Sequence, residues 1–234
     1  MLININRGGG KIILVLSIFL NLFFVSKYFR DKELYRPSRG QAILGWTNSI
    51  KKLNQKFDVA FFGNSITRNS DFTRYFKDCK IINLGCGGDR LQDMLLRMDM
   101  LKAAKADKIF VMAGINGSKD ISLQEFSSLY SQLIDSIKYN NNTSEIFIQS
   151  ILPISKCMEN KESYASNDKI RKMNDIISNL CKQKNIVYID LFDAYFKNGE
   201  LPFKMTKHDG IHISDENYNI WASLISPYII SRKN

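Results

Sequence analysis

Short apolar runs recur along the chain from residue 57 onward, and each is followed by a polar or glycine-rich stretch. The runs are rich in β-branched and aromatic residues, which is typical of strands buried on both faces of a sheet. Five strands are therefore expected, over residues 57–62, 80–84, 108–113, 145–150 and 185–190.

Longer amphipathic stretches separate these runs, and their apolar positions have the spacing of one helical face. Strands that alternate with helices predict βαβ units, and so an α/β fold with a parallel sheet covered on both sides. Ligands of such sheets bind beyond the carboxyl ends of the strands. The helices are expected over residues 42–56, 91–105, 122–138, 167–184 and 215–230.

The N-terminal segment has a different pattern. Arg7 and Lys11 precede an apolar run over residues 12–25 that only Ser17 and Asn21 interrupt. A basic stretch followed by an apolar stretch is typical of an export signal. Bulky and charged residues follow where a small-residue cleavage site would stand, so an uncleaved signal-anchor is expected, with the folded domain periplasmic or extracellular. A cleaved secretory signal and a buried core helix are the alternatives.

The sequence thus divides into three predicted parts. Residues 1–30 form the signal-anchor or transmembrane segment, an N-terminal hydrophobic helix. Residues 31–56 form a tether and a leading helix, and residues 57–232 form one globular domain. A domain of this size buries enough apolar surface to fold without metal or disulfide staples.

The formal charge of +10 does not indicate a nucleic-acid-binding protein. Lysine and arginine are scattered, often beside Asp or Glu, whereas such proteins usually concentrate basic residues in one stripe. No nucleic-acid partner is expected. The charge belongs to a solvated surface, with attraction to an anionic membrane or to acidic glycans as the alternative.

The cysteines do not predict a metal site. The chain has four, Cys79, Cys86, Cys157 and Cys181, without any Cys-x-x-Cys pair, and it has two histidines. That set lacks the ligand spacing of zinc sites. Four cysteines allow three disulfide pairings, and buried free thiols are equally compatible with the sequence.

Three of the expected strands end in turns whose residues could do chemistry: Gly63-Asn64-Ser65-Ile66-Thr67, Gly85-Cys86-Gly87-Gly88-Asp89 and Gly114-Ile115-Asn116-Gly117. Ser65 could be a nucleophile at the edge of the sheet, or it could cap the next helix. The glycine-rich turn could present backbone N–H groups to an oxyanion, and the Asn116 amide could do the same, although both are also ordinary turn chemistry. The turn lacks the spacing of a nucleotide-binding loop.

An imidazole base, if the protein has one, must be His208 or His212. Asp209 precedes His212 by three residues, which is close enough for its carboxylate to hold one ring nitrogen and fix the tautomer. The carboxylate beside His208 is its immediate neighbour and tends to point elsewhere. The alternative is that both histidines lie in a loop before a final helix that starts at Ser214 or Asp215.

In combination these segments resemble the SGNH/GDSL hydrolase superfamily, whose marker residues are Ser, Gly, Asn and His in this order. The resemblance covers roughly residues 58–228. It includes the turns at 83–89 and 113–116, the segments Ser150-Ile151-Leu152-Pro153 and Tyr188-Ile189-Asp190-Leu191, and the closing segment at 209–221.

The resemblance implies a role for each matching residue. Ser65 would be the nucleophile, His212 the general base and Asp209 the carboxylate that orients it. The oxyanion hole would consist of the backbone N–H groups of Ser65 and Gly85 and the side chain of Asn116. The resemblance also implies a flavodoxin-like three-layer α/β/α sandwich with a central sheet of about five strands, and neither a metal nor an organic cofactor.

The chain departs from the family pattern at two positions. Asn64 stands in place of the aspartate of the Gly-Asp-Ser motif, and Gly117 stands where many relatives carry an acidic residue. The expected activity is that of a serine esterase for short acyl esters, preferably acetyl, on carbohydrates. Lipid deacylation, acyl transfer to a sugar, and a membrane-tethered binding module without turnover are the alternatives.

Overall fold

The computed structural model describes residues 37–159, 161 and 164–229. The chain divides into two compact units, residues 1–45 and 46–234, and only residues 37–45 of the first unit are described. The N-terminal apolar run and most of the expected tether lie outside the described residues, so the signal-anchor stays a prediction. No helix within the described ranges is long and apolar enough to cross a membrane.

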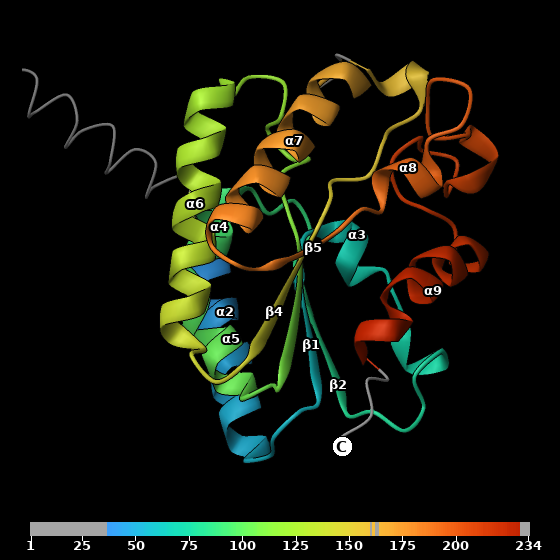
Figure 1. Cartoon of the computed structure of the whole chain (residues 1–234). Coiled ribbons are helices and arrows are strands. Elements are labelled where there is room, and N and C mark those ends of the chain that lie inside the picture. Colours follow the sequence, from blue (N-terminus) through green and yellow to red (C-terminus); the bar gives the residue numbers. More distant parts are fainter. Residues whose placement is uncertain (1–36, 160, 162–163, 230–234) are drawn as a thin grey trace, which may run out of the picture. The chain divides into compact units, whose positions relative to one another are not determined.

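Five parallel strands form the central sheet in the order β2-β1-β3-β4-β5 (Figure 1). This is the flavodoxin-like strand order, and it confirms the expected fold class. Gly63 pairs with Gly85 on one side and with Met112 on the other, so three strands end at the same edge of the sheet. The strands are β1 Val59–Gly63, β2 Ile81–Gly85, β3 Lys108–Met112, β4 Glu145–Gln149 and β5 Val187–Ile189.

Helices cover both faces of the sheet and complete the three layers (Figure 1). One layer contains α4 Leu91–Leu95, α5 Met98–Ala104, α6 Leu123–Asn140 and α7 Asn167–Gln183. The other side carries α3 Ser65–Arg68, α8 Phe192–Tyr195 and α9 Tyr218–Ile229. Helix α2 spans Pro37–Leu53, and short 3-10 turns lie at η1 Phe72–Arg74, η2 Lys156–Met158, η3 Phe203–Met205 and η4 Asp215–Asn217.

Stacked aromatic side chains fix the centre of the sheet. The rings of Phe61 and Phe110 lie 5.4 Å apart, and those of Phe110 and Phe147 lie 4.6 Å apart. On the α9 side, Phe72 packs 4.1 Å from Phe61 and edge-on against Trp221 at 5.2 Å. Such pairs add to the stabilisation from area burial, so the strand ends project from a rigid base.

Three helices differ from the sequence-based expectation. In place of the final helix expected over residues 215–230, residues 215–217 form the 3-10 turn η4 and α9 begins at Tyr218. Helix α2 begins at Pro37 rather than at residue 42. Proline is tolerated in the first turn of a helix, because the N–H groups there have no acceptor within the helix and the missing N–H of proline is not needed. The single helix expected over residues 91–105 is broken between α4 and α5, where Arg97 has φ −120° and ψ 29°. The break turns the Arg97 side chain into the protein interior.

Candidate active site

Ser65 is the first residue of α3, directly beyond the carboxyl end of β1. The helix is capped by Asn64, whose Oδ1 accepts a hydrogen bond of 3.0 Å from the N–H of Ile66. The interpretation that Ser65 caps the helix is therefore wrong, and its hydroxyl is left for other contacts. The position of α3 is held by Tyr218, whose buried hydroxyl donates to the Ile66 carbonyl at 2.6 Å.

The structure brings Ser65, His212 and Asp209 together. The Nε2 atom of His212 lies 2.8 Å from the Ser65 Oγ atom, across 147 positions of sequence. Its Nδ1 atom lies 2.6 Å from Asp209 Oδ2. These two contacts form one hydrogen-bonded chain from carboxylate to imidazole to hydroxyl.

The loop that carries this pair is fixed by its own backbone bonds. Thr206 and Ile213 form an antiparallel bridge, and the N–H of Lys207 donates to the carbonyl of His212 at 2.7 Å. Asp209 Oδ1 accepts from the N–H groups of Ile211 at 2.9 Å and His212 at 2.8 Å. The carboxylate thus shapes the turn with one oxygen and contacts the imidazole with the other.

These contacts also set the charge of Asp209. Partial burial by itself raises the pKa of this carboxyl group, but hydrogen bonds from the Ile211 and His212 N–H groups and from the His212 ring outweigh burial. The pKa of Asp209 is therefore lowered from its usual 3.8. An ionised carboxylate is what the Nδ1–H group of a neutral or protonated imidazole requires as its acceptor.

His208 does not join this chain of hydrogen bonds. It is exposed, with a left-handed backbone at φ +62°, and its ring centroid lies 6.2 Å from that of Phe203. Of the two histidines that the sequence offers, His212 is the one that meets Ser65.

In the glycine-rich turn, the N–H of Gly85 has a partner within the chain. The N–H of Gly85, which was expected to help bind an oxyanion, donates instead to the Oδ1 atom of Asn83 at 2.9 Å. Gly85 has a different structural use, because a Cβ atom there would stand 2.2 Å from the backbone nitrogen of Arg68. Its missing side chain lets α3 approach β2 closely.

Gly88 is the residue of this turn that faces open space. It is exposed, its φ is +76°, and nothing lies within 4 Å of the point where a Cβ atom would stand. Sequence reasoning did not single it out among the three glycines. The order Gly87-Gly88-Asp89 could have indicated it. A turn residue with positive φ is favoured as glycine, and Gly88 stands directly before Asp89, the last residue of the turn.

Asn116 lies half-buried just beyond β3, and its side chain joins the glycine-rich turn. The Nδ2 atom donates to the backbone carbonyl of Asp89 at 2.8 Å. A primary amide carries two hydrogens on nitrogen, so one remains for a second acceptor. The bond brings the Asn116 amide to the residue that directly follows Gly88.

Two hollows are lined by residues from the segments around the candidate site, although Ser65, Asp209 and His212 line neither of them. One, of about 170 Å³, includes Asn116, and its lining combines charged Arg90, Asp120 and Glu125 with apolar Leu91, Ile121 and Phe126. The other, of about 240 Å³, is lined by Lys207, Asp215, Asn69, Asp71, Arg74, Tyr75 and Tyr218. The second hollow would receive hydroxyl-bearing groups more readily than a long acyl chain, because burying charged groups against methylenes is costly.

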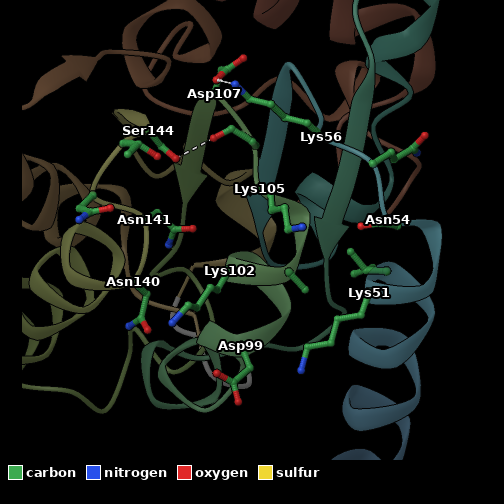
Figure 2. Close-up of a pocket in the computed structure, with 16 residues that line it drawn as sticks. Lys51, Asn54, Lys56, Asp99, Lys102, Lys105, Asp107, Asn140, Asn141 and Ser144 are labelled. Carbon is green, nitrogen blue, oxygen red and sulfur yellow. Dashed lines mark hydrogen bonds and ion pairs between the residues drawn. The ribbon is translucent and has the colours of Figure 1, made fainter.

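A larger hollow of about 700 Å³ lies at the amino ends of the strands, beside the residues that precede β3 and β4 (Figure 2). Its side chains include Lys51 in the last turn of α2 and Lys102 in the last turn of α5. Lysines in a last helical turn offset the negative end of the helix dipole, so their charge there has a local structural reason. This hollow is remote from Ser65 and is not the candidate site.

Thiols and metal ligands do not form a second centre. Cys79, Cys86, Cys157 and Cys181 are free thiols, and burial raises the pKa of Cys181 to about 12. A thiol with a raised pKa is a poor nucleophile at neutral pH. Within residues 37–159, 161 and 164–229, no group of three His, Cys, Asp or Glu side chains is arranged to hold a metal ion.

Comparison with known proteins identifies a family for the chain. The model of the GDSL-like lipase/acylhydrolase family matches residues 61–220. No curated protein matches the chain significantly.

Solved structures show the same fold. A Streptococcus pneumonia protein named for platelet activating factor is 24% identical, with a TM-score of 0.71 over 87% of this chain and 99% of its own. A GDSL-like lipase from Bacteroides thetaiotaomicron is 23% identical, with a TM-score of 0.64 over 74% of this chain and 87% of its own. An acetyl xylan esterase is 22% identical, with a TM-score of 0.61 over 73% of this chain and 98% of its own.

Proposed function

The chain belongs to the GDSL-like lipase/acylhydrolase family, and we propose that it is a serine esterase that cleaves short acyl esters through Ser65. The observation that carries this proposal is the hydrogen-bonded chain from Asp209 through His212 to Ser65, with separations of 2.6 Å and 2.8 Å. A serine hydroxyl is a weak nucleophile until an adjacent base can take its proton.

The reaction would proceed through an acyl-enzyme. His212 Nε2 removes the Ser65 proton as Oγ attacks the ester carbonyl carbon, and Asp209 stabilises the imidazolium that forms. As the tetrahedral intermediate collapses, the bond between the acyl carbon and the alcohol oxygen breaks, and the imidazolium gives its proton to that oxygen, so that the alcohol leaves and Ser65 keeps the acyl group. In the second half, His212 activates a water that attacks the acyl carbon and releases the acid, which regenerates the Ser65 hydroxyl.

The negative oxygen of the tetrahedral intermediate needs hydrogen-bond donors. The N–H of Ser65 is suited, because the first N–H groups of a helix have no acceptor inside it. The second amide hydrogen of Asn116 is also suited. We propose the N–H of Gly88 in place of Gly85 as the third donor, since Gly88 is exposed in the turn that Asn116 contacts. One such donor is worth about 2.7–4 kcal/mol of transition-state stabilisation.

The expected substrate is a short ester, preferably acetyl, on a carbohydrate. The charged lining of the hollow at Lys207 and Asp215 favours a polar alcohol portion over a lipid chain. One structural neighbour is an acetyl xylan esterase, which is a property of that protein and agrees with the proposal. Lipid deacylation and acyl transfer to a sugar would use the same residues.

The test is ester cleavage by the full chain in mild detergent. We expect p-nitrophenyl acetate to be hydrolysed by the parent and not by Ser65→Ala, while Ser223→Ala, an exposed serine on α9, retains the parent rate. Equal rates for the parent and Ser65→Ala would refute the esterase and leave a binding module. A chain-length series and acetate release from acetylated oligosaccharides would then separate acetyl preference from lipase behaviour.

We also propose that the domain is exported and held at the membrane by the N-terminal segment. The support is the sequence of that segment, a basic stretch followed by the apolar run over residues 12–25. Alkaline extraction of membranes tests this, because an anchored chain stays in the pellet. Release of a protein that starts near residue 27 would show a cleaved signal instead.

A further inference from the structure

A buried guanidinium group lies directly beneath the proposed site. The Arg97 side chain is 0% exposed, and its Nε atom is 2.6 Å from Oδ2 of Asp89, which is also 0% exposed. Its two other nitrogens donate to the carbonyl oxygens of Leu84 at 2.6 Å and Gly63 at 2.7 Å. The guanidinium also lies over the Phe62 ring, 4.2 Å from its centroid.

This arrangement is costly to build. A buried ion pair must recover the desolvation of both charges through good geometry, and an apolar side chain of similar volume often does as well or better. The chain also interrupts a helix at Arg97, where the amphipathic pattern predicts continuous helix over residues 91–105. Stabilisation of the fold alone therefore does not explain why a buried ion pair, rather than an apolar side chain, occupies this position.

Asp89, Leu84 and Gly63, which accept from Arg97, belong to the segments that carry the proposed chemistry. Gly63 ends β1, two residues before Ser65. Leu84 lies in β2 at the start of the glycine-rich turn, and Asp89 closes that turn. The backbone carbonyl of Asp89 in turn accepts the hydrogen bond from Asn116.

We propose that Arg97 is a positioning residue for ester hydrolysis. Together with Asp89 it sets the distance between the turn that carries Ser65 and the two segments that supply oxyanion donors. Arg97 touches no reacting atom and acts through the Asp89 carboxylate and the carbonyl groups of Gly63 and Leu84. The rigid, planar guanidinium group suits this task, because its N–H donors point in fixed directions toward several acceptors at once. The inference rests on the proposed esterase function.

Kinetics separate positioning from simple stability. In Arg97→Met we expect kcat to fall about 10²-fold with KM little changed, the loss typical of reacting groups misplaced by about 1 Å. Arg97→Lys keeps a charge beside Asp89 and should fold, but an ammonium cannot reach all three acceptors, so kcat falls there too. The pH profile should keep its shape, because His212 and Asp209 are untouched.

The matched control is Leu101→Ala, a fully buried residue one turn along in α5. It should lower thermal stability while leaving kcat unchanged. The proposal is overturned if both Arg97 variants lose less than about tenfold in kcat. It is also overturned if Leu101→Ala loses as much kcat as they do.

Amide hydrogen exchange tests the same idea without any ester. In Arg97→Lys, exchange should accelerate over residues 63–66 and 84–89 relative to Leu101→Ala. Unchanged exchange in both segments overturns the positioning role whatever the kinetics show. The two proposals can also fail separately. If the parent cleaves no ester but exchange still accelerates in Arg97→Lys, Arg97 holds the segments together and the proposed esterase function is refuted.

Discussion

The substitution Asp209→Asn tests the proposed chain of proton transfer most directly. In the parent, Asp209 Oδ1 accepts two backbone N–H groups at 2.9 and 2.8 Å, and Oδ2 accepts from His212 Nδ1 at 2.6 Å. The asparagine oxygen can keep both backbone bonds. Its amide nitrogen, however, is only a donor, and it would face Nδ1. The imidazole would then carry its hydrogen on Nε2, the atom that must accept the Ser65 proton.

The expected magnitude follows from that wrong tautomer. The same carboxylate-to-amide change in a catalytic triad lowers kcat by about 10⁴. At about 1.36 kcal/mol per factor of ten, this corresponds to about 5.4 kcal/mol of activation free energy. The Asp209 side chain is 42% exposed, and water can replace part of its contact with the imidazole. We therefore expect a loss of about 10³ to 10⁴ in kcat.

The assay is p-nitrophenyl acetate hydrolysis at saturating substrate, with thermal unfolding measured in parallel. Asp135→Asn is the matched control, because it removes the same charge from an exposed ion pair. Asp135 lies on α6, is 60% exposed and pairs with Lys184 at 2.6 Å. It should keep the parent kcat. A kcat for Asp209→Asn within tenfold of the parent, in a folded protein, would refute the proposed role of the carboxylate.

Three further predictions follow from neighbouring contacts. Asn116→Ala should lower kcat about 10²- to 10³-fold, whereas the exposed Asn142→Ala should not, and equal rates for the two would remove Asn116 from the oxyanion site. Tyr218→Phe removes the buried donor to the Ile66 carbonyl and should lower the free energy of unfolding by about 1 kcal/mol, read as a drop of about 2–4 °C in Tm; an unchanged Tm would show that the bond does not stabilise α3. The lowered pKa of Asp209 predicts that the parent is more stable than Asp209→Asn above its ordinary pKa of 3.8 and loses this advantage as the pH falls through the lowered value. Denaturant titrations of the two proteins between pH 6 and pH 3 would show the gap closing, and a gap that widens on acidification would contradict the sign.

The local pattern of the chain determined its fold class and the segments that carry the chemistry. Continuous apolar runs with β-branched and aromatic residues are typical of strands in a parallel sheet that is covered on both faces, so five strands and their order of appearance were predictable. The ends of these strands, at Gly63, Gly85 and Met112, then had to meet at one edge, because parallel strands share a direction. Ser65 and Asn116 were predictable as candidates for that reason, and Asp209 with His212 from their spacing.

Only the tertiary structure decided which atoms meet. The Ser65 hydroxyl meets His212 instead of capping α3. The Asn83 side chain, which accepts from the Gly85 N–H, also donates to the carbonyl groups of Thr67 and Ser70, so both outcomes depend on partners from other segments. The break at Arg97 is of the same kind. Helical spacing marked that position as part of one continuous helix, yet the carbonyl groups of two strand ends and the Asp89 carboxylate draw its side chain inward. Local periodicity records the preferences of neighbouring residues, whereas hydrogen bonds between distant segments exist only once the sheet has brought them together.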